Sequence, residues 1–279
     1  MFFLENTDLL QNLYKFPFQS FAMIETKIIS IEKPKLKDPI CLVGLPGIGH
    51  IGRIAVDYMI HELKTTKFAD LYSPYFFPFV IVHQDRIHTL KNEFYYYKNP
   101  KGRDLILLIG DCQTYDPKGH YEVSGKILSF LHELGCKEIV TLAGFATGNV
   151  TEKPKVFGVT NEDSKYDLKK FGVETKVSGQ IGTIVGASGL LVGLSPLYSM
   201  NGFTLLGETS GFPIITDPNA AEAVLGVVQK VLGIKIDLSK LRQKVEEMHD
   251  FIKKLHEIQQ QAMEQVQKPK KQEDLKYIG

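Results

Sequence analysis

The chain alternates short apolar runs with stretches of helical periodicity from about residue 37 onwards. An apolar run at residues 40–45 leads into a glycine-rich turn and a helical pattern at 51–63, and a second apolar run follows at 68–71. Apolar runs of this length predict strands, and the repeated strand–helix order is typical of a sheet covered by helices on both faces. We therefore predict an α/β protein with three layers, α/β/α.

The middle of the chain departs from a purely parallel pattern. Two strand candidates, residues 87–97 and 104–109, are joined by the turn sequence Asn-Pro-Lys-Gly at 99–102. This turn favours an antiparallel hairpin, so the sheet is predicted to be mixed. An alternating stretch at residues 24–31 predicts a lead-in strand. Residues 1–22 show no such pattern and are interpreted as an extension, which leaves Met23 open as an alternative start.

Two Asp-Pro pairs, at 116–117 and 217–218, mark helix starts, because the carboxylate caps free N–H groups and proline fits the first helical position. The first helix is predicted to end at Gly135 and the second by Gly233, since glycine suits the left-handed position after a helix. Further predictions are a strand at 138–143, a small-residue helix start within 185–194, and a strand at 203–206 after a turn at Asn201-Gly202.

The last forty residues change character. Apolar side chains recur at spacings of three and four, which is the pattern of a coiled-coil seam, and thirty helical residues make a rod of about 45 Å. The seam residues singled out for oligomerisation are Leu241, Val245, Met248, Ile252 and Leu255. Phe251 and Ile258 widen the stripe towards a second contact, so we predict a homo-oligomer that is a dimer of dimers, a tetramer.

The predicted organisation has four parts. Residues 1–37 form the extension and lead-in strand, 38–237 the α/β domain, 238–267 the oligomerisation helix, and 268–279 a flexible tail that begins Lys-Pro-Lys-Lys. Proline stops the helix there, and the tail has almost no apolar residues to bury until its end.

Composition excludes several functional classes. Thirty-three basic against 32 acidic residues give a net charge of +1, which offers no field to attract nucleic acid. No apolar run reaches the ~18 residues of a membrane span, and the N-terminus lacks the basic region of a signal peptide. Cys41, Cys112 and Cys136 are far apart and form no metal-binding motif. We expect reduced thiols, a cytoplasmic protein, and no metal, membrane or nucleic-acid partner.

The glycine-rich turn, GLPGIGHIG at residues 44–52, leaves two interpretations open. Gly47, Gly49 and Gly52 form a GxGxxG between a strand and a helix, as in dinucleotide-binding folds. The acid that should follow about 20 residues later is represented only by Asp70, which falls inside or before the next strand. The alternative is that the glycines allow helix and strand to pack closely. A Walker phosphate loop is absent.

Other candidate chemistry is sparse. Asp111 and Glu208 lie at strand ends, where α/β sheets place their sites, so they are candidates for general acid and base, but without a partner histidine, loop hydrogen bonding is the favoured interpretation. Ser188 lies in Gly-Ala-Ser-Gly, but a nucleophile elbow needs glycine two residues after the serine, and Leu190 is there. We therefore predict no catalytic residue and no cofactor.

Several segments together carry a family resemblance. GLPGIGHIGRIA (44–55), LAGFATG (142–148), KVFGVTNED (155–163), GQIGTIVGASGLLVGL (179–194) and LLGETSGFPIITDPNAAEAVLGVV (205–228) resemble the archaeal branch of the proteasome assembly chaperone 2 family. The resemblance implies a fold similar to purine nucleoside phosphorylases and peptidyl-tRNA hydrolases. It also implies a non-enzymatic partner of the proteasome, although members are often labelled an ATP-grasp superfamily.

The resemblance further implies a docking tail. Archaeal members end in a hydrophobic-tyrosine-X motif that binds between α-subunits of the proteasome core particle. Here the corresponding residues are Leu275, Tyr277, Ile278 and Gly279, with the tyrosine third from last where the motif places it second from last. The sequence favours a homo-oligomeric chaperone or activator of the core particle. The alternative is a nucleoside- or nucleotide-binding enzyme that uses the glycine turn.

Overall fold

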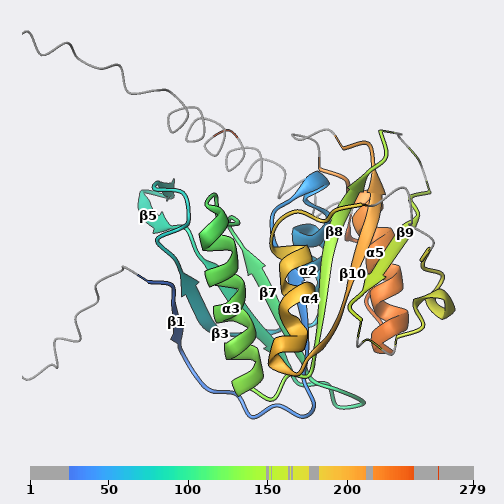
Figure 1. The fold of residues 1–279 in the computed structure, drawn as a ribbon, viewed down its shortest axis with the longest axis horizontal. Helices are drawn as coiled ribbons and strands as arrows, with labels where there is room; N and C mark the ends of the chain where they lie inside the picture. Colours follow the sequence, from blue (N-terminus) through green and yellow to red (C-terminus); the bar gives the residue numbers. More distant parts are fainter. Residues whose placement is uncertain are drawn as a thin grey trace, which may run out of the picture.

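The computed structural model describes residues 25–148, 151, 153–162, 164, 166–175, 182–211, 216–241 and 257. A single eight-stranded sheet runs through the middle of the molecule, in the order β1-β3-β6-β7-β2-β8-β10-β9 (Figure 1). Four strands at its centre are parallel: β7 (Leu105–Gly110), β2 (Ile40–Gly44), β8 (Glu138–Ala146) and β10 (Asn201–Thr209). The predicted α/β class is confirmed.

Antiparallel strands flank the parallel centre on both sides. On one side lie β6 (Asn92–Tyr97), β3 (Thr66–Tyr72) and β1 (Lys27–Ser30), and on the other lies β9 (Val156–Thr160). The predicted mixed sheet and the β6–β7 hairpin are therefore confirmed, as is the lead-in strand β1. The central strands are buried on both faces, which explains why β2 and β7 are apolar throughout.

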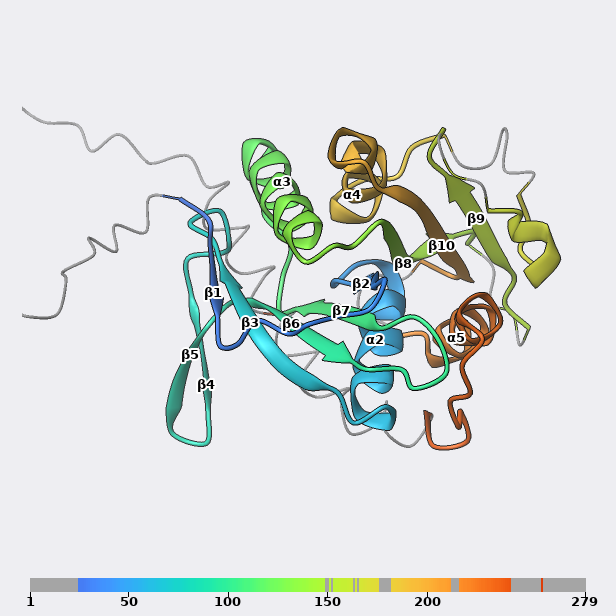
Figure 2. The same ribbon diagram turned by 90° about the horizontal axis from the view of Figure 1, so that it is seen from below.

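In the described part of the chain, two helices cover each face of the sheet, as Figure 2 shows. Helices α2 (Ile51–Glu62) and α5 (Pro218–Leu232) pack on one face, and α3 (Pro117–Glu133) and α4 (Ala187–Leu194) on the other. Both predicted caps are present, because Asp116 and Asp217 each accept a hydrogen bond at 2.9 Å from the backbone N–H three residues on. Short 3-10 helices lie at Ile48–His50, Leu168–Phe171 and Ser195–Tyr198.

Two local predictions were wrong, and one strand was missed. Residues 87–97 do not form one strand, because β5 (Arg86–Thr89) pairs with β4 (Val80–His83) in a separate two-stranded sheet before β6 begins. Gln84 and Asp85 make that turn with positive φ of 48° and 59° although neither is glycine. The strand predicted at 203–206 is β10, which already starts at Asn201, so the predicted turn at Asn201-Gly202 is instead part of the strand. Strand β9 was not predicted.

Other predictions fall partly beyond the described residues. Of the predicted coiled-coil seam, only Leu241 is described, and the whole tail at 268–279 lies outside. Within the part of the chain that the structure describes, no helix is long and apolar enough to cross a membrane.

Candidate functional site at the carboxyl edge of the sheet

The glycine-rich turn after β2 is shaped by backbone contact. A Cβ on Gly52 would lie 1.9 Å from the carbonyl oxygen of Leu142 in β8, and a Cβ on Gly44 would lie 2.1 Å from the carbonyl oxygen of Gly52. Helix α2 therefore touches two strands without any side chain between them. This is the close-packing interpretation of the turn, and the structure confirms it for these two glycines.

The middle of the turn is pressed onto the end of β8. Gly49 has a φ of 63°, in the left-handed region, and a Cβ on Gly144 would lie 2.5 Å from the carbonyl oxygen of Ile48. The Asp217 N–H donates to the Gly49 carbonyl at 3.0 Å, which ties the turn to the start of α5. The backbone of Ile48 and Gly49 thus packs directly against the carboxyl-terminal end of β8. Gly47 lies at the exposed tip of this turn.

Gln113 connects three loops at this edge, and sequence reasoning did not identify it. Its Nε2 donates to the Pro46 carbonyl at 2.6 Å, and its Oε1 accepts from the Ala187 N–H at 2.9 Å. Gly186 adopts a φ of 86°, and a Cβ there would lie 2.5 Å from the Gln113 Oε1. The amide thereby joins the loops that follow β2 and β7 to the start of α4.

The segment around Ser188 is also a packing feature. The Ser188 carbonyl accepts from the Thr141 hydroxyl at 2.9 Å, and a Cβ on Gly189 would lie 2.6 Å from the Ile184 carbonyl oxygen. The small residues here let α4 begin close against β8 and its own incoming loop.

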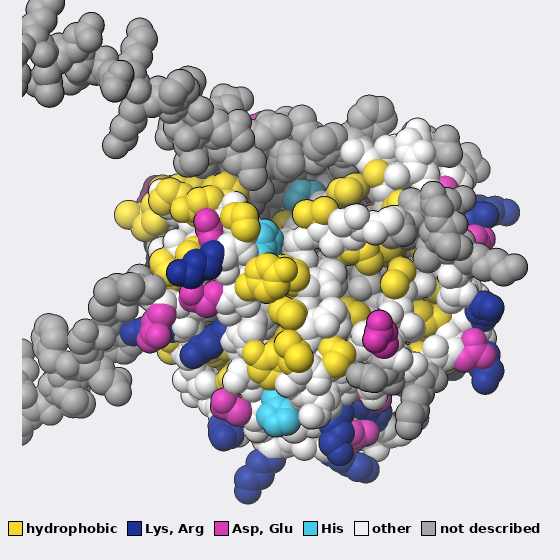
Figure 3. All heavy atoms as spheres, viewed as in Figure 1, with side chains coloured by type: hydrophobic (Ala, Val, Ile, Leu, Met, Phe, Trp, Pro, Cys, Tyr) yellow, Lys and Arg dark blue, Asp and Glu magenta, His cyan; other side chains and the backbone are white. Residues whose placement is uncertain are grey.

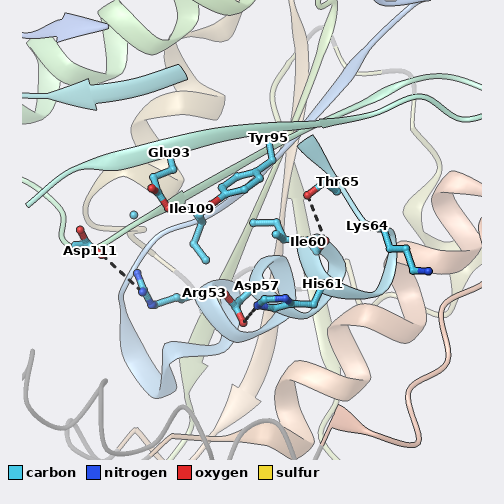
Figure 4. A pocket seen from close by; sticks show the side chains of 11 residues that line it. Arg53, Asp57, Ile60, His61, Lys64, Thr65, Glu93, Tyr95, Ile109 and Asp111 are labelled. Carbon is cyan, nitrogen blue, oxygen red and sulfur yellow. Dashed lines mark hydrogen bonds and ion pairs between the residues drawn. The ribbon is translucent and has the colours of Figure 1, made fainter. Parts of the chain in front are cut away.

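Asp111 directly follows β7 and lies beside Arg53 of α2, in a cavity of about 350 Å³ (Figure 4). The Arg53 guanidinium is 3.8 Å from its carboxylate, and the Lys91 N–H donates to that carboxylate at 3.2 Å. Burial raises the pKa of Asp111, while Arg53 and the N–H bond oppose the rise. Asp111 therefore serves as the partner of a buried arginine.

Other ionisable groups that line this cavity, Glu93, Asp57 and His61, also have partners. Glu93 accepts from Lys67 at 2.6 Å and lies 2.8 Å from the Lys91 ammonium group. Burial opposes ionisation of Glu93, but the two lysines outweigh it and lower its pKa. On α2, His61 lies 3.7 Å from Asp57. Figure 4 shows Glu93, Asp57 and His61 around the apolar side chains of Ile60 and Ile109.

Glu208 lies in a different cavity, of about 430 Å³, beside the ends of β8 and β10. Its carboxylate accepts from the Lys155 N–H at 3.2 Å, and the Lys155 ammonium group is 3.0 Å from Glu174. The structure therefore does not bring Asp111 and Glu208 together as an acid–base pair. Each instead makes the loop hydrogen bonds that were the simpler expectation.

The remaining candidate residues are thiols and the oligomerisation seam. Cys41, Cys112 and Cys136 are free and buried, and among the described residues no group of three or more His, Cys, Asp or Glu side chains is arranged to hold a metal. Leu241 is 1% exposed and belongs to the core between the sheet and α2 and α5. The other seam residues and the tail residues lie outside the described part.

Comparisons with known proteins place the chain among relatives of similar length. A model of the PAC2 family matches residues 41–256. The crystal structure of Pyrococcus furiosus PbaB, an archaeal proteasome activator, is 41% identical with a TM-score of 0.74, covering 83% of this chain and 98% of PbaB. Pyrococcus furiosus PbaA, an archaeal homologue of proteasome-assembly chaperone, is 25% identical with a TM-score of 0.69, covering 85% and 99%.

A protein of Methanocaldococcus jannaschii, the uncharacterized protein MJ1210, is 36% identical over 260 residues, or 92% of this chain and 98% of that protein. These matches do not support the ATP-grasp label.

Proposed function

Because the chain belongs to the PAC2 family, we propose that it is a non-enzymatic, cytoplasmic partner of the proteasome core particle, acting as a chaperone or an activator. The observation that carries the proposal is the 41% identity with PbaB, an archaeal proteasome activator, over almost all of PbaB. The two candidate acids are not arranged as an acid–base pair. Asp111 neutralises buried Arg53, and Glu208 lies in another cavity.

The proposed contact with the core particle is the C-terminal tail. Leu275, Tyr277 and Ile278 provide apolar surface and a phenol that can enter a pocket between α-subunits. The twelve residues from Lys268 extend to at most about 40 Å, which gives the tail reach. Several tails on one oligomer raise the effective concentration at a multi-site ring, so weak individual contacts suffice.

The proposed oligomer is held by the heptad seam. Since Leu241 is buried within its own domain, the part of the seam left for pairing consists of Val245, Met248, Ile252 and Leu255. Burial of each such side chain is worth ~1.5–3 kcal/mol, so the seam can hold chains together. Light scattering on Val245→Asp/Ile252→Asp tests this, and an unchanged mass would contradict it.

The tail is tested by capture of proteasome core particles on immobilised protein. Deletion of Tyr277–Gly279 is expected to abolish capture of α-subunits and leave the oligomer mass unchanged. The matched control, Glu273→Gln/Asp274→Asn, keeps the tail length and the docking residues and is expected to capture normally. Full capture by the truncated chain would assign the contact to the α/β domain instead.

The same protein is titrated with ATP, NAD and nucleosides to test the enzyme alternative. We expect no binding, because the backbone of Ile48 and Gly49 is packed onto the strand end beneath the turn. Binding tighter than micromolar that Gly47→Ala weakens would contradict the non-enzymatic role. Peptidase activity of the core particle, measured with and without the protein, separates an activator from a chaperone.

A further inference from the structure

The β4–β5 hairpin carries an exposed apolar face that the proposed tail contact does not use. Its strands form a sheet of their own, outside the eight-stranded sheet. Val80, Val82 and Ile87 are 44%, 70% and 72% exposed. In Figure 3 hydrophobic side chains gather at the upper left, over the part of the molecule where Figure 1 places this hairpin. All four residues of β5 are exposed.

The pairing register puts these side chains on one face. Val82 lies directly opposite Ile87, and Val80 lies opposite Thr89. Opposite residues, and residues two apart along a strand, project to the same side of a hairpin. The face therefore consists of three β-branched apolar residues and one threonine, and carries no charged side chain. We call this set, Val80, Val82, Ile87 and Thr89, the hairpin face.

The other side of the hairpin is anchored. Ile81 and Phe79 pack against the buried cluster that includes α3, and the Phe79 ring lies 5.9 Å from the Phe77 ring, centroid to centroid. A two-stranded hairpin has little stability of its own, so this packing holds it in place. The hairpin face therefore has a fixed position relative to the rest of the domain.

We propose that the hairpin face is a contact between two copies of this chain, packed face to face across a two-fold axis. Such a contact brings the same patch of both copies together, and an uncharged apolar patch is complementary to itself. At the turn end of the hairpin lie one acid, Asp85 in the turn, and one base, Arg86 at the start of β5. Two copies meeting there therefore bring no net charge against each other, whereas a strongly charged partner would find no complementary charge.

The exposed area of the hairpin face determines which kind of interface it can form. The exposed fractions correspond to roughly 300 Å² per copy, at the lower end of patches that mark interaction sites. A stable dimer typically buries about 1,600 Å² in total, so this face does not hold two copies together unaided. It fits the second interface of an assembly whose first is the heptad seam. The inference thus rests on the homo-oligomer in the proposed function and gives it a second contact.

The test is the solution mass of the full-length chain by light scattering. We expect Val82→Asp/Ile87→Asp to halve the mass, because burying four carboxylates in the two-copy contact is unfavourable. Leu197→Asp is the matched control: Leu197 is 78% exposed in a different element, and its replacement is expected to leave the mass unchanged. Both variants alter exposed side chains, and unchanged thermal unfolding of each checks that the domain remains folded.

Combining variants identifies what covers the face. If two hairpins meet, Val82→Asp/Ile87→Asp and Val245→Asp/Ile252→Asp disrupt separate interfaces, and the combined variant is expected to be monomeric. If the seam helix covers the hairpin face instead, the combined variant has the mass of either parent, and the two-copy contact is overturned. A full-length hairpin variant with unchanged mass also overturns it. Capture of α-subunits by the wild type is scored separately, so failure of the proposed function is distinguishable.

A cross-link gives a second measurement. The three native cysteines are buried, so Ile87→Cys adds a thiol at an exposed position. Oxidation is expected to link two copies through residue 87, and Leu197→Cys is expected to remain unlinked. Equal linking of both variants would indicate random collision and overturn the contact.

Discussion

Replacement of Gly52 by alanine gives the sharpest test of how the turn is built. Alanine normally stabilises a helix relative to glycine by about 1 kcal/mol. Here the new methyl group would lie 1.9 Å from the Leu142 carbonyl oxygen, about 1.5 Å closer than an ordinary contact. Because that atom belongs to the backbone of a central strand, α2 or β8 must move. Overpacking of this kind costs about 1–3 kcal/mol or more, which exceeds the helical gain.

Gly226→Ala is the matched control, because Gly226 lies inside α5 and a Cβ there meets nothing within 4 Å. We expect Gly226→Ala to stabilise the protein by about 0.5–1 kcal/mol and Gly52→Ala to destabilise it by at least about 1 kcal/mol. Urea denaturation followed by circular dichroism measures both free energies of unfolding. Equal gains in the two variants would refute the conclusion that Gly52 is required for backbone contact.

Three further predictions concern stability and reactivity. Asp217→Ala is expected to lower the free energy of unfolding by about 1 kcal/mol, because the Asp217 carboxylate caps α5 by accepting from the Ala220 N–H. In the same denaturation assay, Asp217→Asn should largely retain the cap and the stability. The lowered pKa of Glu93 adds stability that is fully present above the unfolded-state pKa near 4.3 and is lost as pH falls through the folded-state pKa. Glu93→Gln should therefore reduce the loss of unfolding free energy at acid pH in a stability–pH curve. An unchanged acid limb of that curve would contradict this. The three buried thiols, including Cys136 with its pKa raised by burial to about 11, should react with a thiol reagent at pH 8 only after unfolding, and fast labelling of the native protein would show that the core opens.

The elements that sequence predicted well are those set by local chemistry. Asp116 and Asp217 cap their helices, and Gly135 and Gly233 end them with positive φ, because each of these roles depends on neighbours within a few residues. Strand β2 was also clear, since a strand buried on both faces is apolar throughout.

The missed elements depend on partners distant in sequence. The sequence predicts residues 87–97 as one strand, and only the pairing of β4 with β5 ends the first strand at Thr89. Gln113 carried no signal for the same reason. Its hydrogen-bond partners lie 67 and 74 positions away in the sequence, and a single glutamine in a loop gives no pattern from which such contacts can be predicted.

Leu241 shows how a heptad pattern and a domain core can share a residue. Its spacing from Val245 fits the seam, yet the structure buries it with the side chains of α2 and α5. The preceding residues are fixed too, because the Tyr58 hydroxyl donates to the Asp237 carbonyl and the Ser239 N–H donates to the Asp237 carboxylate at 2.9 Å. The described chain is therefore fixed to the domain as far as Leu241. A proposed seam that begins just after this point would set the spacing of paired domains, whereas a free linker would leave that spacing undefined.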